Sequence, residues 1–216
     1  FILQAVIGSD FTQALVLNTA TVLAEPWTLV TSMFLHGSFN HILFNMYALL
    51  MFGPLIEQRI GSKRFLQMYF ASGILAGIGY VIFQELLLGF SSSALGASGA
   101  IMGVLGMTIM LLPKMKVLFF FIIPMSMRTA GIVFALIDLL GVFGIGASNI
   151  ANIAHLVGLA VGLGYAWYLI KQKKQYYKGF ARPYASKATA ATKKDYKETI
   201  ELSEEDVNEY LKKGRL

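Results

Sequence analysis

The sequence contains no cysteine and little charge, and both absences exclude classes of protein. None of its 216 residues is cysteine, which excludes disulfide frameworks, cysteine-zinc sites and thiol nucleophiles. Charged residues make up 14% of the chain and hydrophobic residues 56%, whereas an ordinary soluble domain has roughly 25% charged residues. With a mean hydropathy of +0.62, the composition is typical of a membrane protein. The net charge of +6 therefore favours an anionic membrane surface over a nucleic-acid partner.

The few charges divide into two populations at about residue 170. Residues 1–170 hold six Lys or Arg and five Asp or Glu, whereas residues 171–216 hold twelve and seven. The upstream part contains five apolar runs close to the roughly 20 residues needed to cross a bilayer, namely 38–57, 65–88, 95–112, 129–146 and 150–170. Residues 1–8 look like the end of another helix. We therefore expect an all-α polytopic membrane domain over 1–170, with a first helix that is truncated in this chain.

Lys and Arg in the connections predict the orientation of the spans, because cytoplasmic loops are enriched in these residues. The segments 9–37, 89–94 and 147–149 contain no Lys or Arg. The alternate connections and the start of the tail are basic, with Arg59, Lys63, Arg64, Lys114, Lys116, Arg128, Lys171, Lys173 and Lys174. We expect a multi-pass protein of a prokaryotic plasma membrane, with both termini in the cytoplasm.

Three remaining segments are not ordinary connections. Residues 9–37 are apolar and carry Trp27 and Phe34, so we expect a loop lying in the outer membrane interface. The apolar run Val117–Ile123 is too short to span and is interpreted as an interfacial or re-entrant piece. Residues 171–216 are interpreted as a charged cytoplasmic tail, with one short helix near 204–213.

Polar side chains within the apolar runs gather at one depth. His41 and Asn45 are four residues apart and share a helical face, while Ser98 and His155 each stand just inside the outer end of a run. Each residue alone has an ordinary structural interpretation, such as a hydrogen bond to the preceding turn or to a neighbouring helix. Because alternating spans bring all four to the extracytoplasmic end, a functional cluster is favoured.

Small residues would let the helices that carry Ser98 and His155 approach closely. They form stripes at Gly96, Gly99, Gly103 and Gly106, and at Gly158 and Gly162. A base-activated serine requires a hydrogen bond of roughly 2.6–3.2 Å to its base, and we expect His155 to take the proton of Ser98. We expect the oxyanion to be stabilised by Gly96 and the helix N-terminus that follows it, and by the side chains of Asn45 and His41.

A serine activated by His155 could attack a peptide carbonyl. The other chemistries for cutting peptide bonds in a membrane lack the residues they need. The chain has no His-Glu-x-x-His motif, and His36 and His41 are five residues apart, which does not give one helical face. We expect no metal and no cofactor. An aspartyl mechanism needs two carboxylates in one site, and Asp138 is the only aspartate within a span. Asp138 could be a third triad member for His155, but nothing in the spacing places it behind the imidazole, so we favour a polar or interfacial group at the outer part of its helix.

From Trp27 to Leu169 the sequence resembles the rhomboid intramembrane serine proteases. The resemblance rests on four motifs, His41-Ile42-Leu43-Phe44-Asn45, Gly96-Ala97-Ser98-Gly99, Ala154-His155 followed by Gly158 and Gly162, and Glu57-Gln58-Arg59. It implies a six-helix bundle with a water-filled cavity open to the outer face and a Ser98–His155 dyad without an acidic third member. It also implies Asn45 and His41 at the oxyanion, and Glu57 and Arg59 as a structural motif at the cytoplasmic end.

The resemblance further implies a class of substrate, namely single-pass membrane proteins cut near the outer membrane boundary, where small and helix-weakening residues let the segment unwind. Two residues depart from the family pattern. Thr28 follows Trp27 where the family often has arginine, and Met102 stands where an aromatic residue commonly stacks on the catalytic imidazole.

Two other function classes stay open. A non-proteolytic rhomboid-like protein would bind transmembrane clients, and it usually lacks the serine or the histidine. A small channel or carrier would use the polar cluster as a solute site. Carriers commonly show an inverted repeat, and this sequence shows no repeat.

Overall fold

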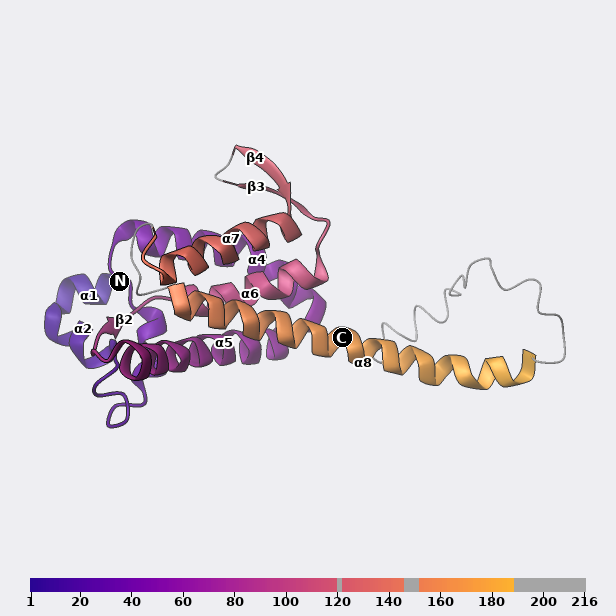
Figure 1. The fold of residues 1–216 in the computed structure, drawn as a ribbon, viewed down its shortest axis with the longest axis horizontal. Coiled ribbons are helices and arrows are strands. Elements are labelled where there is room, and N and C mark those ends of the chain that lie inside the picture. The colour runs from indigo at the N-terminus through magenta and orange to yellow at the C-terminus, as the bar shows by residue number, and fades with distance from the viewer. Residues whose placement is uncertain (120–121, 146–151, 189–216) are drawn as a thin grey trace.

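The computed structural model describes residues 1–119, 122–145 and 152–188, and these are mostly helical. Helices α4 to α8 form a bundle, and α8 extends well beyond the other helices (Figure 1). The elements in chain order are α1 (Ile2–Ile7), α2 (Ser9–Leu15), β1 (Leu17–Asn18), α3 (Thr28–Thr31), η1 (Ser32–Phe34), α4 (Phe39–Ile60), α5 (Ser62–Ile82), η2 (Phe83–Leu88), β2 (Ser93–Ala94), α6 (Ser98–Leu111), β3 (Lys116–Phe119), β4 (Ile123–Ser126), α7 (Met127–Val142) and α8 (Asn152–Ala188).

Three helical segments are long and apolar enough to cross a membrane, which are Phe39–Ile60, Ser62–Leu88 and Asn152–Lys173. Their outward faces carry large apolar side chains, and Leu50 and Ile82 are 72% and 50% exposed. Exposed apolar surface on this scale suits contact with lipid rather than water. The chain is therefore an integral, polytopic membrane protein with a mainly α-helical fold.

Helix α6 is the central helix of the bundle. Every residue from Gly99 to Thr108 is buried, and the helix packs against α4, α5 and α8. A helix that is apolar on all sides is typical of a buried position. Its 14 residues give a length of about 21 Å, which is shorter than a hydrocarbon core of about 30 Å. The predicted run 95–112 thus includes residues before Ser98 that are not helical.

Glycines allow α6 and α8 to pack backbone against backbone. A Cβ atom on Gly158 would collide with the carbonyl oxygen of Gly99, and one on Gly162 would collide with the carbonyl oxygen of Gly103. The expected small-residue stripes therefore lie in this interface, except for Gly96, which precedes α6 and lies against His41. At the opposite end from Ser98, the interface continues into a buried apolar cluster of Ile56, Ile60, Met68, Val104, Met107 and Ala166.

When η2 is counted together with α5, helix ends differ from the predicted spans by at most four residues, with one exception. Helix α8 continues to Ala188, which is 18 residues beyond the predicted end at 170. Hydropathy marks where the apolar run stops, whereas Lys and Gln are good helix formers and prolong the helix into the polar segment. The predicted helix near 204–213 lies outside the described residues.

The segment that the sequence interprets as an interfacial or re-entrant piece at Val117–Ile123 belongs to a β-hairpin that was not predicted. Strands β3 and β4 pair as an antiparallel hairpin, with Lys116 opposite Ser126 and Phe119 opposite Ile123. Pairing of the two strands satisfies backbone N–H and C=O groups that an unpaired re-entrant segment would leave without hydrogen bonds. Leu118 and Ile123 remain 60% and 54% exposed, so a position at the membrane interface stays a prediction.

The segment before α4 folds over the end of the bundle where α6 and α8 begin (Figure 1). Residues 1–8 contain α1, where the sequence predicted a helix end, and 9–37 contain α2, β1, α3 and η1. Strand β1 pairs with β2, with Leu17 opposite Ala94, which ties this segment to the loop that leads into Ser98. Trp27 and Phe34 are 52% and 60% exposed.

Candidate active site

Ser98 and His155, 57 residues apart in sequence, meet at one end of the bundle. The Oγ atom of Ser98 lies 2.9 Å from Nε2 of His155. Ser98 is the first residue of α6 and His155 lies in the first turn of α8, so two helix starts come together (Figure 1). The glycine contacts between the same two helices bring their backbones close enough for this side-chain hydrogen bond.

The second ring nitrogen of His155 contacts Asp138. Nδ1 of His155 lies 3.0 Å from Oδ1 of Asp138, which projects from α7. Asp138 is 7% exposed. The structure thus places the favoured polar group of α7 against the imidazole of His155, a contact that the sequence did not place.

The sequence contained a signal for this contact that spacing along one helix does not reveal. The runs that carry Asp138 and His155 are joined by a short connection, which makes them antiparallel neighbours. Residues equally far from the middle of such a connection tend to face each other. Gly141 and Asn152 follow the same symmetry, since a Cβ atom on Gly141 would collide with the side chain of Asn152.

The two contacts of His155 assign its tautomer. Asp138 accepts a hydrogen bond from Nδ1–H, so Nε2 carries the lone pair that accepts from the hydroxyl of Ser98. A hydroxyl facing an imidazole lone pair is the arrangement of a base-activated nucleophile. The His155 side chain is 23% exposed, so the protein does not enclose the pair completely.

Asn45 has an unpaired donor beside Gly96, in the loop that leads into Ser98. Asn45 is 7% exposed, and its Nδ2 atom has no hydrogen-bond partner within the described residues. A Cβ atom built on Gly96 would lie 3.8 Å from this nitrogen and 2.7 Å from Nε2 of His41. Buried donors without partners are uncommon, so this amide has an unused hydrogen-bond donor close to the loop that leads into Ser98.

Gly96 does not contribute a free backbone donor. Its N–H donates to the carbonyl oxygen of Ser32 over 2.9 Å, which corrects the expectation that Gly96 itself stabilises an oxyanion. Gly96 has φ +121° and touches the ring of His41, so glycine is required there for conformation and space. The first N–H groups of α6, beginning at Ser98, have no acceptor within the helix. The cap residue Ala97 gives them no side-chain acceptor either.

His41 and His36 form an aromatic pair next to the loop before α6. The two rings meet edge to face at 5.1 Å between centroids. His41 is held by the helix cap, since its N–H donates to Oγ of Ser38. His36 is 4% exposed, and its burial, with a smaller effect of His41, lowers the pKa of His36. The sequence singled out His36 only as a metal-ligand candidate, and burial was not visible there.

The two departures from the family pattern have structural roles. Thr28 is fully buried and its hydroxyl donates to the carbonyl oxygen of Glu25 over 2.6 Å, which fixes the start of α3. Met102 lies one turn below Ser98 in a buried apolar cluster with Leu105, Met127 and Leu159.

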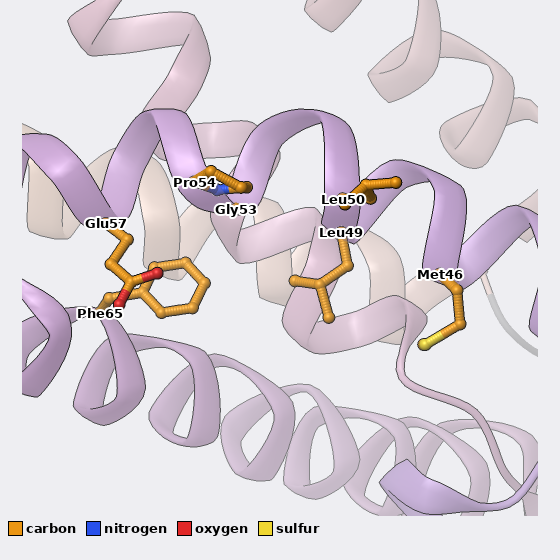
Figure 2. A pocket seen from close by; sticks show the side chains of 7 residues that line it. All are labelled: Met46, Leu49, Leu50, Gly53, Pro54, Glu57 and Phe65. Carbon is orange, nitrogen blue, oxygen red and sulfur yellow. The ribbon is translucent and has the colours of Figure 1, made fainter.

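Glu57 and Arg59 lie in the last turn of α4, away from Ser98. Glu57 lines an apolar groove of about 360 Å³ along α4, together with Met46, Leu49, Leu50, Gly53, Pro54 and Phe65 (Figure 2). Neither Glu57 nor Arg59 forms one of the ion pairs in the described part of the chain. Bracing by these two residues therefore stays a prediction.

Ser98 forms part of the wall of a small cavity. This cavity holds about 50 Å³ and lies between α3, α5 and α6, with Gly96, Gly99 and Ala154 among its lining residues. Its walls are mostly small or apolar side chains. Among the described residues, no three His, Asp or Glu side chains gather in a group that could hold a metal ion.

Comparison with known proteins agrees with the motifs. Residues 23–172 match the model of the Rhomboid domain. The chain is 31% identical over 160 residues to the rhomboid-family protein YdcA of Bacillus subtilis (strain 168), covering 74% of this chain and 75% of YdcA. It is 36% identical over 169 residues to rhomboid protease GluP of the same organism, covering 75% of this chain but 31% of GluP.

A mitochondrial relative shows a similar partial match. The chain is 33% identical over 150 residues to the human presenilin-associated rhomboid-like protein, covering 68% of this chain and 38% of that protein. The chain thus spans about a third of GluP and of this human relative. On the match to the domain model and to YdcA, the chain belongs to the rhomboid family.

Proposed function

We propose that this protein is an intramembrane serine endopeptidase that hydrolyses peptide bonds in or near transmembrane segments of other membrane proteins. The observation that carries the proposal is the 2.9 Å contact between Ser98 Oγ and His155 Nε2. A serine in an apolar helix normally bonds its own preceding turn, and a histidine there is costly. Their pairing at the start of two helices has a direct use in nucleophilic catalysis.

The first half of the reaction forms an acyl-enzyme. Nε2 of His155 takes the proton of the Ser98 hydroxyl while Oγ attacks the carbonyl carbon of the scissile peptide. The carbonyl oxygen becomes an oxyanion, for which Nδ2–H of Asn45 and the backbone N–H of Ser98 are available donors, with His41 beside them. The protonated imidazole then gives its proton to the leaving amine, and the C–N bond breaks.

The second half restores the serine. A water molecule that enters from the exposed side of His155 gives a proton to Nε2 and attacks the ester carbon. The tetrahedral intermediate collapses, the C–O bond to Ser98 breaks, and the imidazole returns the proton to Oγ. The 23% exposure of the His155 side chain supports such an entry.

The cavity beside Ser98 supports a preference for small side chains at the cleaved bond. Its volume of about 50 Å³ is about a third of that of an apolar cavity of roughly 150 Å³ that binds benzene. A substrate residue such as alanine or serine fits this space, whereas a large aromatic residue would have to displace the wall. The site belongs on the extracytoplasmic side if the basic connections face the cytoplasm.

The test uses the full chain purified in detergent with a single-pass model substrate. We expect wild-type protein to cleave the substrate and to react with a fluorophosphonate at Ser98. Ser98→Ala is expected to abolish cleavage with little change in melting temperature, His155→Ala is expected to abolish cleavage as well, and Ser9→Ala, at an exposed serine, should leave the rate unchanged. Cleavage that persists in Ser98→Ala would refute the proposal, and substrate binding without cleavage by wild type would favour a client-binding protein.

A further inference from the structure

We infer that Asp138 is a positioning residue for the general base, an inference that rests on the proposed function and adds a third member to it. Asp138 Oδ1 lies 3.0 Å from Nδ1 of His155, and Ser98 lies 2.9 Å from the other ring nitrogen. The three side chains come from three helices, α7, α8 and α6. They form a continuous chain of hydrogen bonds from carboxylate to hydroxyl.

The contact between α7 and α8 fixes this geometry independently of the charge. Asp138 and Gly141 are three residues apart on α7, and Asn152 and His155 are three apart on α8. Gly141 lets the side chain of Asn152 lie against the backbone of α7. One helical turn away, the same antiparallel register brings Asp138 to His155, so the pair belongs to the packed interface of two helices.

The burial of Asp138 means that its carboxylate needs a hydrogen-bond partner. The side chain of Asp138 is 10% exposed, and a carboxylate at that depth in a membrane protein is costly unless it has a partner. Nδ1–H of His155 is its hydrogen-bond partner in the described structure. The same bond keeps the proton on Nδ1 and so keeps the lone pair of Nε2 toward Ser98.

Asp138 acts without receiving the transferred proton. During attack, the proton of Ser98 moves to Nε2 and the ring becomes an imidazolium, whose positive charge lies beside the carboxylate of Asp138. The proton then leaves from Nε2 to the amine, and Asp138 keeps its hydrogen bond to Nδ1 throughout. The carboxylate thus orients the ring and stabilises its charged state.

Three variants separate this role from simple packing. Asp138→Asn keeps the size but can present an N–H to Nδ1, which favours the tautomer with a protonated Nε2. Asp138→Glu keeps the carboxylate and adds a methylene. Asp10→Asn makes the same chemical change at an exposed carboxylate on α2 and is the matched control.

Positioning of the base predicts a specific order of rates. We expect Asp138→Asn to lower kcat for the model substrate by about 10²–10⁴-fold with KM nearly unchanged, as loss of the correct tautomer does in other serine enzymes. Fluorophosphonate labelling of Ser98 should slow in parallel. Asp138→Glu should retain a higher kcat than Asp138→Asn although it disturbs packing more, and Asp10→Asn should match wild type.

The outcomes decide between the two hypotheses. If wild type cleaves but Asp138→Asn keeps kcat within about threefold, which is below any loss expected for the wrong tautomer, the inference about Asp138 is refuted and the proposed function stands. It is also refuted if both variants lose kcat only in proportion to a lowered melting temperature, since that is a packing effect. If wild type neither cleaves nor labels, the proposed function itself fails.

Discussion

At the scale of single residues, the amide of Asn45 is an unsatisfied group close to the loop that leads into Ser98. Its Nδ2 atom is buried and has no partner among the described residues. A buried donor without an acceptor costs about 1–3 kcal/mol. An oxyanion formed at Ser98 would supply the missing acceptor, so the cost falls on the free enzyme and is removed in the transition state.

Replacing Asn45 with alanine should therefore separate activity from stability. We expect Asn45→Ala to lower kcat by about 100–1000-fold, which is typical of the loss of one oxyanion donor. KM should change little, because the bond forms only in the transition state. Steady-state cleavage and a thermal melt in detergent measure the two quantities.

The matched control lies on the same helix. Asn40 is exposed at the start of α4, and Asn40→Ala should leave both kcat and the melting temperature unchanged. A fall in the melting temperature of Asn45→Ala that accounts for its lost activity would show a structural role for the amide and contradict its role as an oxyanion donor.

How far the site could be predicted differs from residue to residue. Ser98, His155, His41 and Asn45 follow from their position in apolar runs and from topology, since alternating spans bring them to one end. Asp138 could not be placed by spacing within its helix, because its contact depends on the register between α7 and α8. The role of Gly96 depends on a backbone φ and a hydrogen bond to Ser32, neither of which leaves a pattern in the side chains.

At the scale of elements, the interface of α6 with α8 positions the site. Gly162 packs on the carbonyl oxygen of Gly103, whereas a Cβ atom on Gly164 would meet nothing within 4 Å. Two glycines on one helix, two residues apart, thus face opposite environments. They offer a matched pair for testing whether close helix approach is needed for activity.

We expect opposite effects of alanine at the two positions. Gly162→Ala should destabilise the protein by about 1–3 kcal/mol, because backbone must move to admit the methyl group, and cleavage should fall as Ser98 and His155 separate. Gly164→Ala should be neutral or stabilising by up to about 1 kcal/mol, since alanine favours the helix. Thermal unfolding in detergent and the cleavage rate report both. Equal melting temperatures for the two variants would contradict the packing assigned to Gly162.

The elements themselves were predicted unevenly. Apolar runs locate the membrane-embedded helices because hydropathy reports contact with lipid and core. The apolar runs do not show where α8 ends, because the helix continues beyond Ile170 into polar residues that are good helix formers. The hairpin of β3 and β4 was missed because a run of seven apolar residues reads alike in a strand and in an interfacial segment.

At the scale of the whole molecule, the site and the basic hairpin lie toward opposite ends of the bundle. Ser98 and His155 meet near α1 and α2, whereas β3 and β4 follow the far end of α6 (Figure 1). Three exposed basic residues mark the hairpin, with Lys116 in β3 and with Lys114 and Arg128 beside it. Because basic residues are retained in the cytoplasm, this arrangement predicts an active site that opens on the other side of the membrane.

The absence of cysteine makes this orientation directly measurable. Any single cysteine introduced is the only thiol in the chain, so labelling by a membrane-impermeant maleimide reports the side on which it lies. Asp10→Cys on α2 and Lys116→Cys on β3 are exposed positions toward the two ends. In intact cells we expect Asp10→Cys to be labelled at once and Lys116→Cys only after permeabilisation. Labelling in the reverse order would place the Ser98–His155 pair on the cytoplasmic side and would contradict cleavage of substrates at the outer membrane boundary.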